Sequence, residues 1–229
     1  MSLRMKVISS VGMRSIIQEL TSLYEAKNNT PIELSFGSSA MILSRIETGE
    51  YADLVILASS AMDTLLKQDL LLPSSCQSLA STGVGVSCRA ATSYPDISTV
   101  KLFKQALVQA NSIAYTTSGV SGIYFTQLLS KLDLSDLVSS KAVTLPEGQI
   151  ARLLVNGSAD LAIQLTSELV GFPGTEYIGP LPPELQMEVI FRAGIFTNSK
   201  YTEDALDFLQ FVGQSELTPI YTKNGMNQI

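Results

Sequence analysis

The chain of 229 residues contains no histidine, no tryptophan and only two cysteines. Histidine is the commonest general base and the commonest transition-metal ligand, and two cysteines alone cannot build a zinc site. We therefore expect no bound metal and no other cofactor. Cys76 and Cys88 would form one disulfide in an exported chain or remain two small buried hydrophobic side chains, and we favour the second alternative.

Clusters of basic residues and long apolar runs are also absent. The 15 Lys and Arg residues are outnumbered by 21 Asp and Glu residues, which gives a net charge of −6 and argues against binding to nucleic acid. No run approaches the roughly 20 apolar residues of a membrane-spanning helix, so we expect no stable membrane insertion. The N-terminus has no charged region followed by a secretory apolar core. Either the chain is cytoplasmic or an export leader is missing from the sequence.

Hydrophobic residues make up 45% of the sequence, enough to bury a large core in one domain or in two lobes. Apolar periodicity predicts strands that alternate with helices, which is typical of an α/β fold. We expect two Rossmann-like lobes on either side of a central cleft, with residues 4–82 and 192–229 in one lobe and 83–191 in the other. Expected strands are 6–9, 32–36, 53–58, 83–88, 112–115, 142–145, 160–165 and 187–196; expected helices are 13–24, 39–48, 60–68, 100–110, 121–132, 202–213 and 216–223, with another near Ile150.

Four short segments rich in serine or glycine each end an expected strand or its loop and open an amphipathic helix. We number them as the first to fourth junctions: residues 8–12 (ISSVG), 35–39 (SFGSS), 117–122 (TSGVSG) and 146–148 (PEG). A helix start carries unpaired backbone N–H groups and the positive end of the helix dipole. Several such starts aimed at one cleft would hold an anion without any basic side chain. The junctions therefore predict a protein that binds a small anionic solute.

The order of several motifs resembles that of the molybdate-type solute-binding proteins of ABC transporters. The second junction is followed by IETGEYADL at residues 46–54, and the later matches are SGIY at 121–124, PEGQ at 146–149 and IYTKNGM at 220–226. The resemblance covers essentially the whole chain. It implies the type II periplasmic-binding-protein fold, a monomer outside the cytoplasm, and delivery of the solute to an ABC permease.

The resemblance also implies a set of ligand contacts. The family uses one serine from each of the first two junctions, backbone N–H groups from two helix starts of the second lobe, and a tyrosine near the hinge. Ser39 matches the second serine, but Gly12 and Leu165 stand where the first serine and the tyrosine are expected. Each bond not made to a buried charge costs about 1.5–3 kcal/mol. The loss of two donors disfavours molybdate itself. We expect the solute to be a small anion, either an oxyanion of the molybdate, tungstate or sulfate type or a small carboxylate. The segments QLTSE at 164–168 and IGPLPPELQ at 178–186 are typical of a divergent branch.

Further candidate contacts lie in the first two junctions. Ser9 or Ser10 would supply a hydroxyl to the ligand or cap its own helix. Gly12 leaves room for the backbone to approach a ligand. One of Ser38 and Ser39 would cap the next helix while the other faces the ligand, and we favour Ser39 for the ligand.

Four other residues carry open alternatives. A cation in a first helical turn opposes the dipole, so Arg14 either meets the ligand or is solvated. Gln164 lies in an apolar strand, where a buried amide faces the cleft or joins an internal network. We expect Glu168 to be solvated or to help the lobes close, and Tyr124 to belong to the core. The candidate ligand-binding set is Ser10, Gly12, Arg14, Ser38, Ser39, Ser121, Gly122, Gln149 and Gln164.

Two other classes of function compete with a transport protein. An enzyme without histidine would need a carboxylate pair, a Ser-Lys dyad or a thiol, and the chain has no Ser-x-x-Lys motif, nucleophile elbow or phosphate-binding loop in a suitable setting. We therefore do not expect an enzyme. A cytoplasmic sensor or buffer of the same fold remains the alternative, although no helix-turn-helix segment precedes residue 5.

Overall fold

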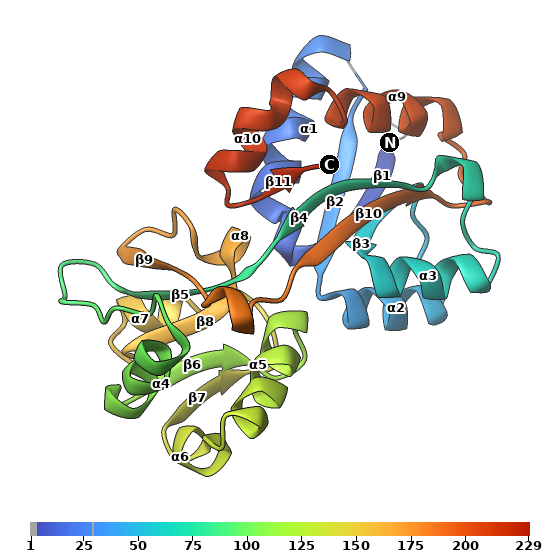
Figure 1. Cartoon of the computed structure of the whole chain (residues 1–229). Coiled ribbons are helices and arrows are strands. Elements are labelled where there is room, and N and C mark those ends of the chain that lie inside the picture. The colour runs from blue at the N-terminus through green and yellow to red at the C-terminus, as the bar shows by residue number, and fades with distance from the viewer. Residues whose placement is uncertain (1–3, 29) are drawn as a thin grey trace. The chain divides into compact units, whose positions relative to one another are not determined.

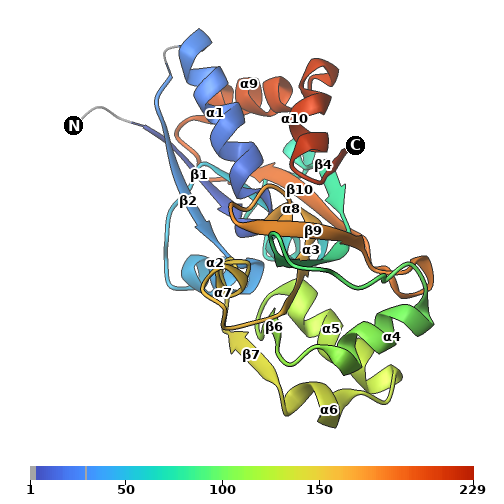
Figure 2. The same cartoon turned by 90° about the vertical axis from the view of Figure 1, so that its left-hand side faces the viewer.

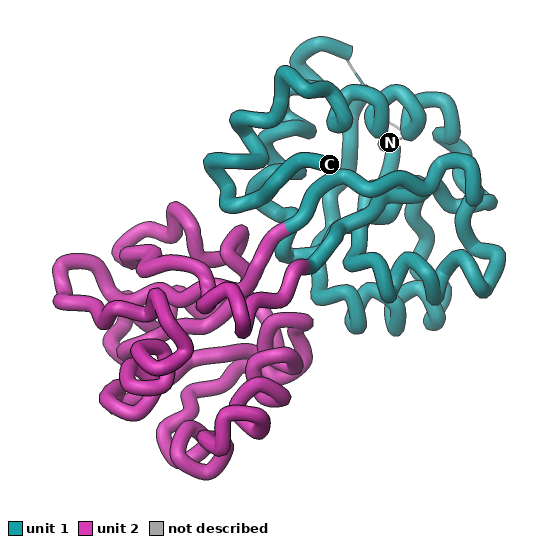
Figure 3. Tube along the Cα trace, viewed as in Figure 1, with its two compact units in different colours: residues 1–81, 189–229 teal, residues 82–188 magenta. Residues whose placement is uncertain are grey.

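The computed structural model describes residues 4–28 and 30–229. By its internal contacts the chain divides into two compact units, shown in different colours in Figure 3. Unit 1 comprises Met1–Ser81 and Val189–Ile229, and unit 2 comprises Thr82–Glu188. The chain thus leaves unit 1 once and returns to it once.

Unit 1 contains a six-stranded mixed sheet in the order β11-β4-β10-β3-β1-β2. β1 lies between β2 and β3 and is parallel to both, whereas β10 is antiparallel to β3 and β11 is antiparallel to β4. The carboxyl ends of β1, β2 and β3 therefore meet at one edge of the sheet. The strands are β1 (Met5–Ser10), β2 (Ile32–Gly37), β3 (Leu54–Ala58), β4 (Gln77–Thr82), β10 (Val189–Ile195) and β11 (Asn227–Gln228).

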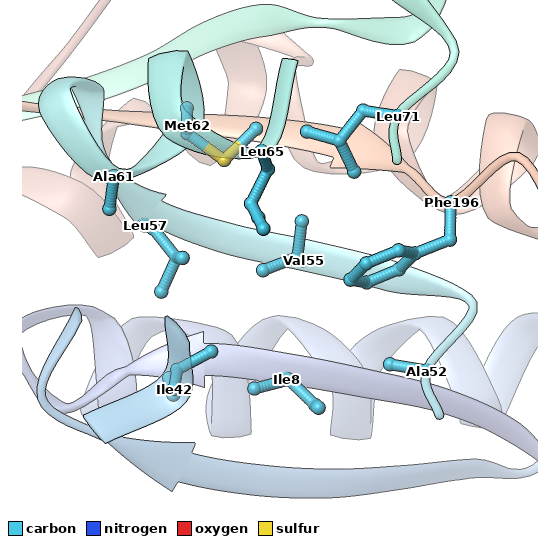
Figure 4. Packing of buried hydrophobic residues seen from close by; sticks show 10 residues of the cluster. All are labelled: Ile8, Ile42, Ala52, Val55, Leu57, Ala61, Met62, Leu65, Leu71 and Phe196. Atoms are coloured by element: carbon cyan, nitrogen blue, oxygen red, sulfur yellow. The ribbon is translucent and has the colours of Figure 1, made fainter. Parts of the chain in front are cut away.

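Helices cover both faces of this sheet (Figure 1). α2 and α3 enclose one apolar cluster, in which Ile42 and Met62 from the helices pack near Ile8 and Val55 from the strands (Figure 4). α1 and α9 lie side by side over the other face (Figure 2). Between them Tyr24 meets Phe208 edge to face, with ring centroids 5.1 Å apart. The helices are α1 (Arg14–Asn28), α2 (Ser39–Glu47), α3 (Ser59–Lys67), α9 (Thr202–Val212) and α10 (Thr218–Lys223), with 3-10 turns at Val11–Met13, Pro73–Ser75 and Ser215–Leu217.

Unit 2 contains a five-stranded sheet in the order β7-β6-β8-β5-β9. β6 is parallel to β7 and β8, and β5 is antiparallel to β8 and β9. The strands are β5 (Val84–Arg89), β6 (Ile113–Thr116), β7 (Ala142–Leu145), β8 (Leu161–Leu165) and β9 (Thr175–Pro180). The helices are α4 (Val100–Gln109), α5 (Val120–Lys131), α6 (Ser135–Ser139), α7 (Arg152–Val155) and α8 (Thr166–Leu169), with a 3-10 turn at Pro183–Leu185.

The α/β alternation predicted from the sequence is confirmed, and most expected elements agree with the structure within two or three residues. The sequence analysis missed β4, β9, β11, α6 and α8 (Thr166–Leu169). β9 lies at a sheet edge and contains Gly179 and Pro180, so its sequence is typical of a loop. The prediction that the fourth junction opens an amphipathic helix is wrong. A turn follows this junction, and α7 begins only at Arg152 and has four residues.

A buried carboxylate ties the start of β3 to its neighbours. The Asp53 side chain is fully buried and accepts hydrogen bonds from the Lys6 backbone N–H (2.8 Å), the Ser199 hydroxyl (2.9 Å) and the Lys200 backbone N–H (3.2 Å). The Tyr51 hydroxyl donates a further, short hydrogen bond to the same carboxylate. These donors compensate the cost of burying the charge.

We expect Asp53→Ala to lower the free energy of unfolding of unit 1 by about 2–4 kcal/mol, because several buried donors would lose their acceptor. Urea denaturation followed by circular dichroism measures the change. The matched control is Asp63→Ala, which removes a carboxylate 2.7 Å from Arg192 in an exposed ion pair and should cost at most about 1 kcal/mol. Equal effects of the two substitutions would contradict a structural role for Asp53.

Candidate functional site

The first two junctions lie next to each other in unit 1. In the register of the parallel strands Ser9 is opposite Phe36, and Ser10 is opposite Gly37. β1 is also paired with β3, whose carboxyl end leads directly into α3 at Ser59. Three helix starts therefore gather at one edge of the sheet, which is where open α/β sheets bind ligands.

At the first junction, Ser10 serves as a helix cap. Its hydroxyl oxygen accepts a long hydrogen bond, 3.4 Å, from the Gly12 backbone N–H at the start of the 3-10 turn that leads into α1. Ser9 is fully buried, and its hydroxyl lies 3.4 Å from the Ser10 carbonyl oxygen. Ser10 therefore caps its helix, and because its hydroxyl only accepts in this bond, donation from Ser10 to a ligand stays a prediction.

At the second junction, the two serines differ. Ser38 caps α2, because its hydroxyl oxygen accepts a hydrogen bond of 3.2 Å from the Met41 backbone N–H. The Ser39 hydroxyl oxygen is half-buried and accepts only a long bond, 3.4 Å, from the Ala58 backbone N–H at the end of β3. Within the described part of the chain no acceptor is bonded to the Ser39 hydroxyl proton. This hydroxyl can still donate.

Arg45, in the last turn of α2, connects this helix to the second junction. Its guanidinium donates to the Ser35 hydroxyl at 2.5 Å and to the Phe36 carbonyl at 3.3 Å, and it forms a close ion pair with Glu50. The hydrogen bond from Arg45 lowers the pKa of the Glu50 carboxyl, although partial burial opposes that shift. Arg45 is thus engaged within unit 1.

Arg14 connects the first junction to the second. It is the first residue of α1, and the central carbon of its guanidinium lies 4.6 Å from the centroid of the Phe36 ring, within the range of a cation–π contact. The Arg14 side chain is half-buried rather than fully solvated. In residues 4–28 and 30–229 no carboxylate forms an ion pair with it.

The third junction, in unit 2, is built on glycine. Gly119 is the N-cap of α5 and has no side chain to cap the helix. A Cβ atom at Gly122 would lie 1.6 Å from the Thr116 carbonyl oxygen, so only glycine allows β6 and α5 to approach this closely. Ser121 is buried beside it. The Thr116 hydroxyl faces the same first turn; Thr116 is 2% exposed, and no described residue is hydrogen-bonded to its Oγ1.

At the fourth junction, Gln164 organises the turn. Gln164 is 2% exposed; its Oε1 accepts from the Ile150 backbone N–H (3.2 Å), and its Nε2 donates to the Gly148 carbonyl (2.8 Å) and to Glu168 Oε1 (2.9 Å). Of the two alternatives for Gln164, the structure shows the internal network. Gln149 lies in the turn held by this network and is half-buried, three residues before α7.

Two further expectations concern side chains of unit 2. The prediction that Glu168 is solvated is wrong, because Glu168 is only 6% exposed and accepts a hydrogen bond from Gln164. The alternative, that it helps the lobes close, stays a prediction. The Tyr124 hydroxyl donates to the Leu185 carbonyl at 2.8 Å, and its ring is half-buried. Leu165, at the expected tyrosine position, is buried at the end of β8. The sequence analysis missed Thr116, since a threonine at a strand end has no distinctive pattern.

Neither cysteine is paired: Cys76 is half-buried and Cys88 is buried, and burial raises the pKa of both thiols. Such thiols are poor nucleophiles at neutral pH. Within the described ranges, no three acidic or cysteine side chains gather as a metal ion would require. None of the described helices has the length and apolar character needed to cross a bilayer.

We expect Gln164→Leu to lower the free energy of unfolding by about 2–3 kcal/mol, because Ile150 N–H and the Gly148 carbonyl would lose a buried partner. Chemical denaturation of the variant measures this loss. Gln109→Leu is a suitable control, because Gln109 is exposed in the last turn of α4 in the same unit. If the two variants were equally stable, the network would not support the fourth junction.

Known structures resemble this chain along its whole length. The periplasmic molybdate-binding protein of Azotobacter vinelandii superposes with a TM-score of 0.82 at 19% sequence identity, covering 97% of this chain and 98% of that chain. A periplasmic thiamin-binding protein superposes with a TM-score of 0.77 at 16% identity, covering 100% and 85%. At these identities the likeness shows the fold, which is the two-lobed type II fold of periplasmic binding proteins.

Sequence comparisons place the chain in a family. Among curated proteins it is similar to an aconitate isomerase from Pseudomonas sp, with 27% identity over 97% of this chain and 87% of the relative. A family model described as bacterial extracellular solute-binding protein matches residues 5–227. The chain therefore belongs to the bacterial extracellular solute-binding protein family.

Proposed function

We propose that this protein binds a small anionic solute, either an oxyanion or a small carboxylate, and delivers it to an ABC permease. The start of α5 carries the proposal. Its N-cap has no side chain, and the buried Thr116 hydroxyl faces its first turn without a partner in the described residues. A buried hydroxyl without a partner is rare in proteins, and a helix start favours negative charge. An anion seated at this helix start would accept from its unpaired backbone N–H groups.

Unit 1 would supply a second set of contacts. The Ser39 hydroxyl still has a proton to donate, and the Arg14 guanidinium lies over Phe36 at the neighbouring junction. Ser10 and Ser38 would orient the helix starts, and the Ser10 hydroxyl, which only accepts its capping bond, would also have a proton to donate. The backbone at Gly12 and Gly122 would leave room for the ligand, and Ser121 and Gln149 would present backbone N–H groups.

A bound anion that displaces water from a helix start would interact more strongly with the helix dipole, because charge–dipole interactions become stronger when water is excluded. Membership in an extracellular solute-binding family supports an ABC permease as the partner of the loaded protein. A sensor or buffer of the same fold would bind the same solute without a permease.

An isomerase of a small tricarboxylate is the second candidate function, because the curated relative is named an aconitate isomerase. The chain offers little general-base chemistry, since it contains no histidine. The buried carboxylate of Glu168 already accepts a hydrogen bond from Gln164. We therefore favour binding over catalysis for this chain.

A thermal-shift screen with molybdate, tungstate, sulfate, citrate, aconitate and succinate tests the proposal. A ligand present at about a hundred times its dissociation constant should stabilise the protein by roughly 2.7 kcal/mol, because it binds the folded state alone. The absence of a shift with every anion would overturn the proposed function. Incubation with cis- and trans-aconitate, followed by proton NMR, separates the two candidates, since an isomerase would interconvert them and a binding protein would not.

We expect Ser39→Ala to weaken the binding of the anion found in that screen by about tenfold or more, because a hydrogen bond to a charged ligand contributes on the order of 1.5–3 kcal/mol. Isothermal titration calorimetry measures the affinity. Ser22→Ala is the control; the Ser22 hydroxyl donates to Gln18 on the exposed side of α1. Unchanged affinity of the Ser39 variant would remove this residue from the site.

A further inference from the structure

We infer that unit 2 carries a second small-molecule site, which binds a small zwitterion with an apolar side chain, of the aliphatic α-amino-acid type. The site is a hollow of about 440 Å³ at one end of the unit 2 sheet. Ligand pockets in proteins typically enclose about 300–1,000 Å³, are mostly apolar, and contain a few polar groups that orient the ligand. The hollow has both this size and this kind of lining.

The hollow lies at the sheet edge opposite the third and fourth junctions. These junctions follow the carboxyl ends of the parallel strands β6 and β7. β8 is parallel to β6, so its first residue, Leu161, lies at the other edge of the sheet, and Cys88 of the antiparallel strand β5 is paired with it. Both residues line the hollow, together with the end of α4. A ligand bound there would therefore be additional to the solute of the proposed function.

The floor of the hollow is apolar and buried. Cys88 and Ala106 are each 3% exposed, and Leu161 is 4% exposed. Tyr94, in the segment between β5 and α4, also lines the hollow and is 56% exposed. Burial of apolar surface against such a floor and an aromatic ring favours binding of an apolar side chain.

Two residues of opposite charge line the same hollow without pairing with each other. Arg89 is the last residue of β5, and Asp160 directly precedes β8. Neither belongs to an ion pair within residues 4–28 and 30–229. A Cβ atom built on Gly157 would lie 3.6 Å from Arg89 Nη1, so the guanidinium lies close to the turn that leads into β8. No acceptor in the described part of the chain is bonded to this guanidinium, which leaves it available to a ligand.

The Asp160 carboxylate is oriented through one of its two oxygens. Its Oδ2 accepts from the Asn111 backbone N–H (2.8 Å) and from Asn111 Nδ2 (3.0 Å). Among the described residues no donor is bonded to Oδ1. The protein therefore holds this carboxylate in place and leaves one oxygen to accept from a ligand, while the Arg89 guanidinium has N–H donors that match a ligand carboxylate.

These charges favour a zwitterion over a singly charged ligand. A carboxylate would be attracted by Arg89 but repelled by Asp160, and the reverse holds for an ammonium group. Glu176 is opposite Cys88 in the register of β5 and β9. Burial raises the pKa of the Cys88 thiol and the charge of Glu176 raises it further, so this second carboxylate also disfavours a simple anion. An α-amino acid with an apolar side chain would use both charges and the floor.

Ligand-observed NMR titrations of the wild-type protein with valine, leucine and methionine test the inference. We expect at least one of these amino acids to bind. The singly charged analogues of the one that binds should bind at least about tenfold more weakly, because each loses one charge-assisted hydrogen bond. For leucine these analogues are 3-methylbutylamine and 4-methylpentanoate. Glycine, which has no apolar side chain, should also bind more weakly.

Substitutions in the hollow test the two charges separately. Arg89→Gln and Asp160→Asn should each weaken binding of the amino acid about 10- to 100-fold. Arg89→Gln should also abolish the preference for the amino acid over the amine, and Asp160→Asn the preference over the acid. Arg152→Gln and Asp136→Asn are the matched controls, because each removes one charge from an exposed helix position of unit 2 outside the hollow, and they should leave the affinity unchanged.

Circular dichroism shows whether each variant is folded, and the panel with the wild-type protein tests the charge preference even if a variant is not. Absence of binding by all three amino acids, equal affinity for the singly charged analogues, or full affinity in the folded Arg89 and Asp160 variants would overturn the inference. The proposed function would stand in each case, since it is tested by the separate screen of anions.

Discussion

The structure depends on how each buried parallel strand turns into the helix that follows it. A helix start leaves backbone N–H groups without intrahelical partners, and a strand end in the sheet interior has little room for side chains. Unit 1 meets this constraint with hydroxyl caps, since Ser10 and Ser38 accept from the N–H groups of Gly12 and Met41. Unit 2 meets it with glycine at the start of α5, where a Cβ at Gly122 would collide with the Thr116 carbonyl.

These two solutions leave different chemistry available to a ligand. In unit 1 the hydroxyls of Ser10 and Ser39 each accept one long hydrogen bond and keep a proton to donate, and Arg14 lies at the same pair of junctions. In unit 2 no side chain caps α5, so the backbone N–H groups of its first turn are the donors at this junction, and the Thr116 hydroxyl is buried against that turn. The first arrangement selects by charge and shape, whereas the second is generic for negative groups. Specificity for the solute should therefore reside mainly in unit 1.

The sequence predicted the fold well because its junctions and apolar strands are local patterns. Residues 53–58 are nearly all apolar, as expected for a strand buried on both faces, and β3 covers Leu54–Ala58. Edge strands were missed because β9 is half exposed and rich in turn-forming residues. At the candidate site the residue types were predictable, but their partners were not. Whether Gln164 faces a ligand depends on Gly148, Ile150 and Glu168, whose contacts with it are set by the fold of unit 2.

Gln164 and Leu165 lie at the end of β8, where the molybdate-type resemblance places a ligand contact. This chain keeps the fold there although its side chain differs from the expected one. Leu165 replaces a tyrosine at the end of β8 and is buried, so it supports packing and offers no hydroxyl. The neighbouring Gln164 holds the fourth junction from within, so the turn keeps its shape without a ligand contact from this strand. Because the scaffold is stabilised internally, substitutions that remove oxyanion donors need not destabilise it. A protein of this fold can thus accept different side chains at its junctions without losing the scaffold that holds them.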